Sequence, residues 1–169
     1  MVGFGCQQRI TDPAATLADS GTSNSTHQKA LRLIMSQPDQ TPSDLDALQG
    51  LVYRPGYDSA LRLEGMNYLL HVDRQLLLTT LRRRLPRITD HDWLRDVCRF
   101  VAQHDLVELD EALVSSWGRP WSGGMSETDR PEYRALRAMH GPDGPTQAVW
   151  KAFEASTKPS QQGLRARCW

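Results

Sequence analysis

The feature that most constrains the fold is a short pattern that recurs along the chain. In each copy an apolar or aromatic residue precedes an arginine, and apolar positions at helical spacing follow. The arginines are separated by 30, 33, 39 and 31 residues, and they are Arg32, Arg62, Arg95, Arg134 and Arg165. A repeated unit of this length that contains two helices predicts an α-solenoid, because each unit buries its apolar side only against its neighbours.

Composition narrows the class of protein further. The 169 residues are 39% hydrophobic and 24% charged, with 20 basic and 20 acidic side chains. We therefore expect one globular domain without the net positive charge that would attract nucleic acid. No apolar run approaches the roughly 20 residues that a membrane-spanning helix needs. The one basic run, Arg82-Arg83-Arg84 with Arg87, favours a solvated helix end, with an anion-binding patch as the alternative.

Caps and breaks divide the chain into helices. We expect them at 25–37, 43–54, 58–71, 73–85, 90–103 and 106–117, with two more beginning near 130 and 146. The stretch 118–128 is rich in Gly and Pro, so we expect it to form a loop on one face of the repeats. The last residues, 161–169, read as the first helix of another unit, which predicts that the solenoid is truncated or covered by a partner there.

These residues resemble HEAT repeats over about 26–169. That family's unit is two antiparallel helices, with an aspartate in the turn between them and an arginine shortly after it. Aspartates precede three of the five arginines: Asp58 before Arg62, Asp90 and Asp92 before Arg95, and Asp129 before Arg134. The resemblance implies an all-α, right-handed superhelix of about four antiparallel helix pairs. It also implies that these charges form a structural ladder between neighbouring units, since a half-buried guanidinium needs an acceptor.

The first 25 residues lack a helical stripe, and we expect them to be a disordered tail or a tether. The small residue Gly5 precedes Cys6, which resembles the end of a bacterial lipoprotein signal, although the basic and apolar regions of such a signal are missing. A true start upstream would place the protein at the cell envelope through a lipid on Cys6. Otherwise Cys6 is incidental and the protein is cytoplasmic.

The residue types of known catalytic and metal sites do not gather in the sequence. The five histidines and three cysteines lack ligand spacing, so we expect neither a metal nor a cofactor. Cys98 and Cys168 each follow a repeat arginine by three residues and are expected to pack against helices. Trp117 directly precedes the 118–128 loop and Trp121 lies near its beginning, and with Arg99 they are the residues that we expect to bind a partner.

The leading function is therefore a non-catalytic protein-interaction scaffold. The apolar residues Val149, Trp150, Ala152 and Phe153 would face an incomplete neighbour, which predicts self-association through that end. One alternative is an enzyme, because some HEAT-like proteins are bilin lyases or DNA glycosylases. It would need a pocket in which Asp, Arg and Trp side chains converge. A purely structural fragment of a larger solenoid is the third hypothesis.

Overall fold

The protein is all-helical in the part that the computed structural model describes, which is residues 10–54, 56–118 and 126–157. No strand occurs among these residues, and the all-α prediction is confirmed. Two compact units divide between Leu77 and Leu78, inside helix α5 (Arg74–Arg84). Within the described ranges, no helix has the length and apolar character needed to cross a membrane.

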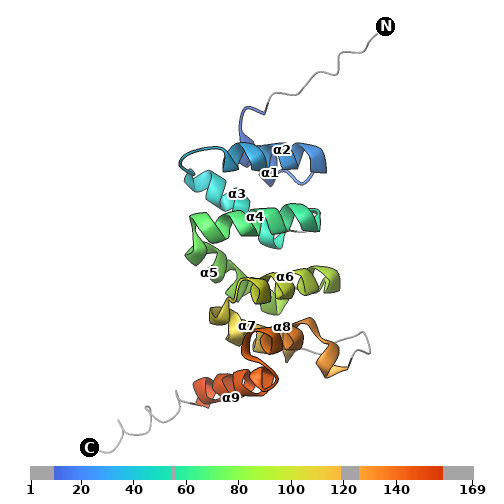
Figure 1. Ribbon diagram of the computed structural model, residues 1–169. Helices are drawn as coiled ribbons and strands as arrows, with labels where there is room; N and C mark the ends of the chain where they lie inside the picture. The colour runs from blue at the N-terminus through green and yellow to red at the C-terminus, as the bar shows by residue number, and fades with distance from the viewer. Residues whose placement is uncertain (1–9, 55, 119–125, 158–169) are drawn as a thin grey trace, which may run out of the picture. The chain divides into compact units, whose positions relative to one another are not determined.

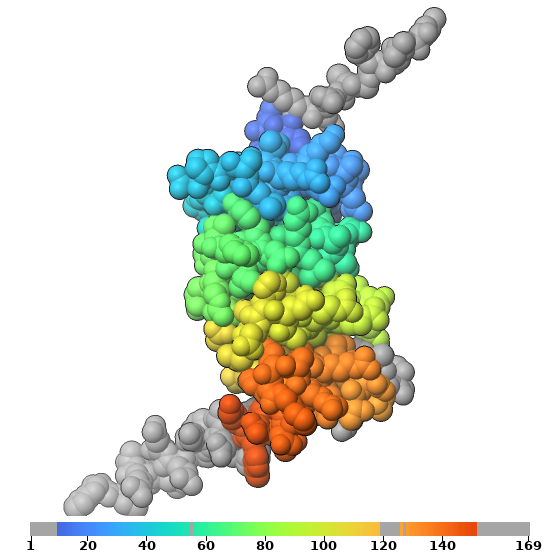
Figure 2. Space-filling view, in the orientation of Figure 1, coloured from blue at the N-terminus to red at the C-terminus, as the bar shows by residue number. Residues whose placement is uncertain are grey.

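In the described residues of the first unit, four helices precede α5. They are α1 (Pro13–Ala18), α2 (Asn24–Met35), α3 (Pro42–Tyr53) and α4 (Ser59–Val72). Helix α1 packs on α2 and α3, and both α2 and α3 pack on α4 (Figure 1). The surfaces of α2 and α4 meet in the space-filling view of Figure 2. The fully buried side chains of this core include Leu17, Leu31, Ile34, Leu48, Leu51, Met66 and Leu69.

Local capping explains why the helices of this unit begin where they do. Thr41 accepts a hydrogen bond from the amide of Asp44, and the Asp44 carboxylate accepts one from the amide of Thr41, which is a complete capping box. Pro42 occupies the first turn of α3, where its missing N–H is not needed. The side chains of Ser23 and Asp58 cap α2 and α4 in the same way. These helices begin and end within two residues of the sequence prediction.

The prediction that residues 1–25 are disordered is wrong for the part that the structure describes. Asp12 caps α1 by accepting from the amide of Ala15 at 2.9 Å, and Leu17 is fully buried. The helix has only six residues, and just Ala14 and Leu17 are buried. Two apolar contacts are too few for a visible stripe, so only packing against α2 and α3 identifies α1 as part of the fold. Residues 1–9 lie outside the described ranges.

Three side chains from later in the chain bind the carbonyl groups at the end of α1. The Tyr57 hydroxyl donates to the carbonyl of Leu17 at 2.6 Å, and His27 Nε2–H donates to that of Asp19 at 2.8 Å. Arg54 donates to the carbonyl between them, at Ala18, over 3.3 Å. The last carbonyls of a helix lack intrahelical donors. These bonds therefore fasten α1 to the rest of the unit.

The second unit continues from the end of α5. Its elements are the 3-10 turn η1 (Leu85–Arg87), α6 (His91–Gln103), η2 (Val107–Leu109), α7 (Asp110–Trp117), η3 (Glu127–Asp129), α8 (Pro131–His140) and α9 (Gly144–Thr157). Helix α8 packs on α6, α7 and α9, and α7 also packs on α9 and η1. The expected helix at 106–117 thus begins with a 3-10 turn. Helix α8 ends at Gly141, whose φ of +79° suits glycine at this position.

Helix α6 contributes more buried apolar side chains to the core of the second unit than any other element of the described residues. The side chains of this core include Trp93, Leu94, Val97, Phe100, Val101, Leu109, Leu113 and Leu136. Cys98 is buried among them, as the sequence predicts. Cys168 lies outside the described ranges.

Candidate functional site

Arg62 is the one ladder arginine that is buried in the described part of the chain. Its side chain is 7% exposed and donates to the carbonyl of Arg54, the residue that follows α3. Asp58, expected to belong to the ladder, instead caps α4 by accepting from the amide of Ala60 at 2.8 Å. Arg62 thus satisfies the end of one helix from inside the next helix.

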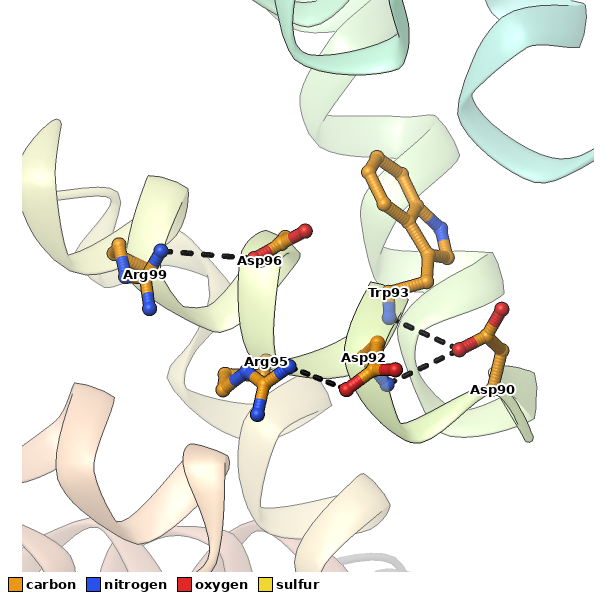
Figure 3. Close-up of polar contacts among 6 residues, drawn as sticks. All are labelled: Asp90, Asp92, Trp93, Arg95, Asp96 and Arg99. Atoms are coloured by element: carbon orange, nitrogen blue, oxygen red, sulfur yellow. Dashed lines mark hydrogen bonds and ion pairs between the residues drawn. The ribbon is translucent and has the colours of Figure 1, made fainter. Parts of the chain in front are cut away.

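The other ladder residues form local pairs on the surface. Arg95 is 54% exposed and pairs with Asp92, one turn before it in α6 (Figure 3). Asp90 caps α6 by accepting from the amides of Asp92 and Trp93. Arg134 and Asp129 are exposed and 2.8 Å apart. The expectation of a half-buried Arg95 is therefore wrong, because its position in α6 points away from the core.

The remaining two ladder arginines give no further support for the ladder. Arg32 is exposed on α2, and Arg165 lies outside the described residues. The short-range pairs of Arg95 and Arg134 join residues within five positions of each other. Exposed pairs of this kind contribute little stability, typically about 0–1 kcal/mol.

The expected binding residues occupy separate places in the second unit. Arg99 is exposed on α6 and lies 3.6 Å from Asp96 (Figure 3). Trp117 is half-buried at the end of α7, where its ring meets Tyr133 of α8 edge-on, with the ring centroids 5.5 Å apart. Trp117 thus fastens the beginning of the 118–128 stretch to α8. Trp121 and Cys6 lie outside the described ranges.

A buried ionic cluster at the start of α8 was not predicted from the sequence. Arg130 donates to the Glu132 carboxylate at 3.1 Å and to the carbonyl of Ser116 at 3.2 Å. The Ser116 hydroxyl donates to the same carboxylate oxygen at 2.8 Å. The cluster therefore joins the end of α7 to the start of α8, which are separated in sequence by residues 118–130. Arg-Pro-Glu after a break indicates a helix start, but nothing local indicates burial.

The thiol of Cys98 lies near this cluster and is not activated by it. Burial raises the pKa of Cys98 well above its ordinary value of 9.0, and the Glu132 carboxylate raises it further, while Arg130 opposes the shift. The thiol therefore stays protonated at neutral pH. Because the thiolate is the reactive form of cysteine, this position is suited to packing and not to nucleophilic attack.

A shallow cleft on the first unit has the composition of a binding surface. We call it the α4 cleft; it has a volume of about 550 Å³ and is lined by Met35, Ala60, Leu63, Glu64, Asn67, Tyr68 and His71. The first three side chains give it an apolar floor, and the other four bring polar groups. An apolar surface with a few polar groups is the usual composition of a site that holds a partner or ligand.

Hydrogen bonds hold two of the polar side chains of the α4 cleft in place. Gln40 donates to the Tyr68 hydroxyl, and the same amide group donates to the carbonyls of Ile34 and Gln37 at the end of α2. His71 Nδ1–H donates to the carbonyl of Asn67 at 2.7 Å. The ring of Tyr68 is therefore positioned before any partner arrives, which lowers the entropy lost on binding.

Helix α9 carries the largest exposed apolar side chain of the described residues. Trp150 is 64% exposed, Val149 beside it is 41% exposed, and the next residue, Lys151, is also exposed. We call Val149 and Trp150 the α9 pair. The sequence predicts an uncovered apolar face here, and the structure exposes both side chains. The side chains of Ala152 and Phe153 lie outside the described part.

The comparisons with protein-family models, curated proteins and solved structures find no match for this chain. Among the described residues, no group of His, Cys, Asp and Glu side chains has the arrangement of a metal site. The two candidate binding surfaces are the α4 cleft in the first unit and the α9 pair in the second.

Proposed function

We propose that this protein is a non-catalytic protein-binding module that uses the α4 cleft as its binding surface. The observation that carries the proposal is the apolar floor of the cleft, open to solvent and bordered by a Tyr68 side chain that Gln40 fixes in place. A shallow apolar surface of this kind suits a side chain or helix of another protein, because association removes its apolar area from water.

The packing within each unit supports a repeat architecture related to HEAT repeats. In the first unit α1 packs on α3 and α2 on α4, and in the second unit α6 packs on α8 and α7 on α9. Contact between every second helix is what stacked two-helix units require. In such architectures partners commonly bind along the stacked helices, which is the position of α4 in its unit. The HEAT-like superhelix remains part of this proposal.

A substitution in the floor of the α4 cleft tests the proposal. We expect Leu63→Glu to abolish capture of a protein that the full chain binds, because a carboxylate would be buried in the apolar contact. Val107→Glu, a similar change at an exposed apolar residue in the second unit, serves as the control. With the captured protein purified, titration calorimetry should show at least about a tenfold weaker affinity for Leu63→Glu, which is about 1.4 kcal/mol. Equal binding by both variants would remove the α4 cleft from the function.

A further inference from the structure

We propose that the partner of the α4 cleft is a second copy of this chain, which places its α9 pair in the cleft. The inference rests on the proposed function and names the occupant of that same site. It is carried by the chemistry of the two surfaces, which match in apolar character and in charge.

The apolar match is between the Trp150 side chain and the floor of the α4 cleft. Trp150 is 64% exposed, and its neighbour Val149 adds a second exposed apolar group. The cleft offers Met35, Ala60 and Leu63 in a space of about 550 Å³. Tryptophan buries a large area and is the residue type most enriched among interface anchors. Moving this ring into the cleft removes two exposed apolar surfaces from water together.

The polar groups of the cleft suit the polar end of the same ring. An indole has one N–H donor, which needs an acceptor once it is buried. Glu64 and Asn67 bring a carboxylate and an amide oxygen to the cleft lining. The α4 cleft therefore contains acceptors for the indole N–H as well as an apolar floor for its rings.

Charge complementarity sets the register of the contact. Lys151 follows Trp150 and is exposed, while Glu64 lines the cleft. Successive residues of a helix point about 100° apart, so a Lys151 side chain would lie at the flank when Trp150 points into the cleft. An ammonium there would meet the Glu64 carboxylate. A pair at the edge of an interface contributes more to orientation and specificity than to affinity.

The two surfaces belong to different parts of the chain, so the contact joins unlike patches. Each copy carries one α4 cleft and one α9 pair. Every copy can therefore insert its α9 pair into one neighbour and bind the α9 pair of another in its own cleft. Unlike patches build rings or open chains of copies, and they close into a dimer where two such contacts form reciprocally. Self-association that depends on both surfaces is thus the signature of the proposal.

Sedimentation of the full chain over a wide range of concentration tests the inference. We expect the average mass of the native protein to rise with concentration. Trp150→Ala and Leu63→Glu should each weaken association at least about tenfold. Val107→Ala, at a residue 42% exposed against 41% for Val149, should leave it unchanged. A native chain that stays monomeric, or Trp150→Ala and Val107→Ala variants that associate alike, would overturn the proposal. Circular dichroism checks that each variant is folded.

Mixing the variants gives the most specific result. Leu63→Glu keeps its α9 pair and Trp150→Ala keeps its cleft, so the mixture should associate more strongly than either variant does alone. It should stop at dimers, because only one productive contact remains. Glu64→Lys and Lys151→Glu should each weaken association, and the chain that carries both changes should recover it. A mixture that remains monomeric, or a double variant without recovery, would contradict the proposed contact.

The failure of this inference can be distinguished from that of the proposed function. The purified chain could be monomeric while the Leu63→Glu variant still fails to bind another protein that the native chain binds. In that case the second copy is not the partner, and the cleft remains a binding surface. If the chain is monomeric and no binding depends on Leu63, both proposals are wrong.

Discussion

Arg62 and Arg95 occupy equivalent places in the sequence pattern and have different roles in the structure. Arg62 is buried and donates to the carbonyl that follows α3. Arg95 is 54% exposed and pairs with Asp92 of its own helix. Removing the donor to a buried carbonyl lowers stability because the carbonyl is left without a hydrogen bond. When one member of an exposed ion pair is removed, water replaces it and little stability is lost. Burial, and not the repeated pattern, therefore decides which arginine stabilises the fold.

We expect Arg62→Ala to lower the free energy of unfolding by about 1–3 kcal/mol, since it removes a charged donor from the Arg54 carbonyl. Arg95→Ala should lower it by no more than about 0.5 kcal/mol, the value typical of an exposed pair within a helix. Urea denaturation of the two variants beside the native chain measures both. A larger loss for Arg95→Ala would restore the ladder that the sequence pattern implies.

Asp129 provides a test of local electrostatics at the surface. The hydroxyl of Ser126 donates to its carboxylate at 2.7 Å and Arg134 donates at 2.8 Å, which together lower the pKa of Asp129 below its ordinary value of 3.8. The folded state therefore favours the ionised form. The resulting stability is present above the unfolded pKa and is lost as the pH falls through the folded one.

We expect Ser126→Ala to raise the pKa of Asp129 towards its ordinary value, because the largest cause of the shift is removed. The carboxyl carbon of Asp129, followed by NMR between neutral and acid pH, reports the change directly. Asp19, which accepts from Gly21 and Thr22, is the internal control, since its titration should not move. An unchanged Asp129 would mean that Ser126 does not bind it in solution.

Among the elements, α1 shows how a short helix is stabilised by its surroundings. A helix of six residues is not stable alone in water. It persists here because Leu17 is fully buried and because Tyr57, His27 and Arg54 bind the carbonyls at its end. The stability of α1 therefore comes from its packing on α2 and α3 and from hydrogen bonds to residues of α2 and residues that follow α3.

We expect Leu17→Ala to lower the free energy of unfolding by about 2–5 kcal/mol, as is usual for a buried leucine. Leu33→Ala, at a leucine that is 42% exposed on α2, should change it by no more than about 0.5 kcal/mol. Chemical denaturation followed by circular dichroism compares the two variants. Similar small losses for both would indicate that α1 is not packed on the first unit in solution.

At the scale of the whole molecule, the chain consists of two compact units that meet in sequence within α5. The packing described above lies within each unit, between neighbouring helices and between every second helix. In architectures with mainly near-neighbour contacts, stability is approximately a sum of local terms. A local loss of packing should therefore open one part of the chain more than the rest.

We expect Leu48→Ala, in the core of the first unit, to speed amide hydrogen exchange in α2–α4 more than in α6–α8. Leu113→Ala, in the core of the second unit, should have the reverse effect. Hydrogen exchange read by mass spectrometry gives both patterns in the full chain. Equal loss of protection throughout the chain for each variant would mean that the two units unfold as one.

Apart from α1, the sequence by itself determined the helical elements of the described residues, because their signals are local. The caps at Asp58 and Asp90 and the glycine after α8 act within a few residues of the chain. The sequence also placed Trp150 on an apolar stripe of its helix, but its exposure of 64% depends on which neighbours cover that stripe.

Only the tertiary structure decided what becomes buried and which side chains meet. The burial of Arg62, the attachment of α1 and the Arg130–Glu132 pair each require knowing which helices touch. The α4 cleft also depends on tertiary contacts. In the sequence Leu63 and Tyr68 do not differ from other positions of α4, and the cleft forms only where the end of α2 lies beside them. Helix formation depends mainly on neighbours in sequence, whereas burial depends on neighbours in space. The pattern of a single sequence therefore specifies helices far more directly than it specifies burial.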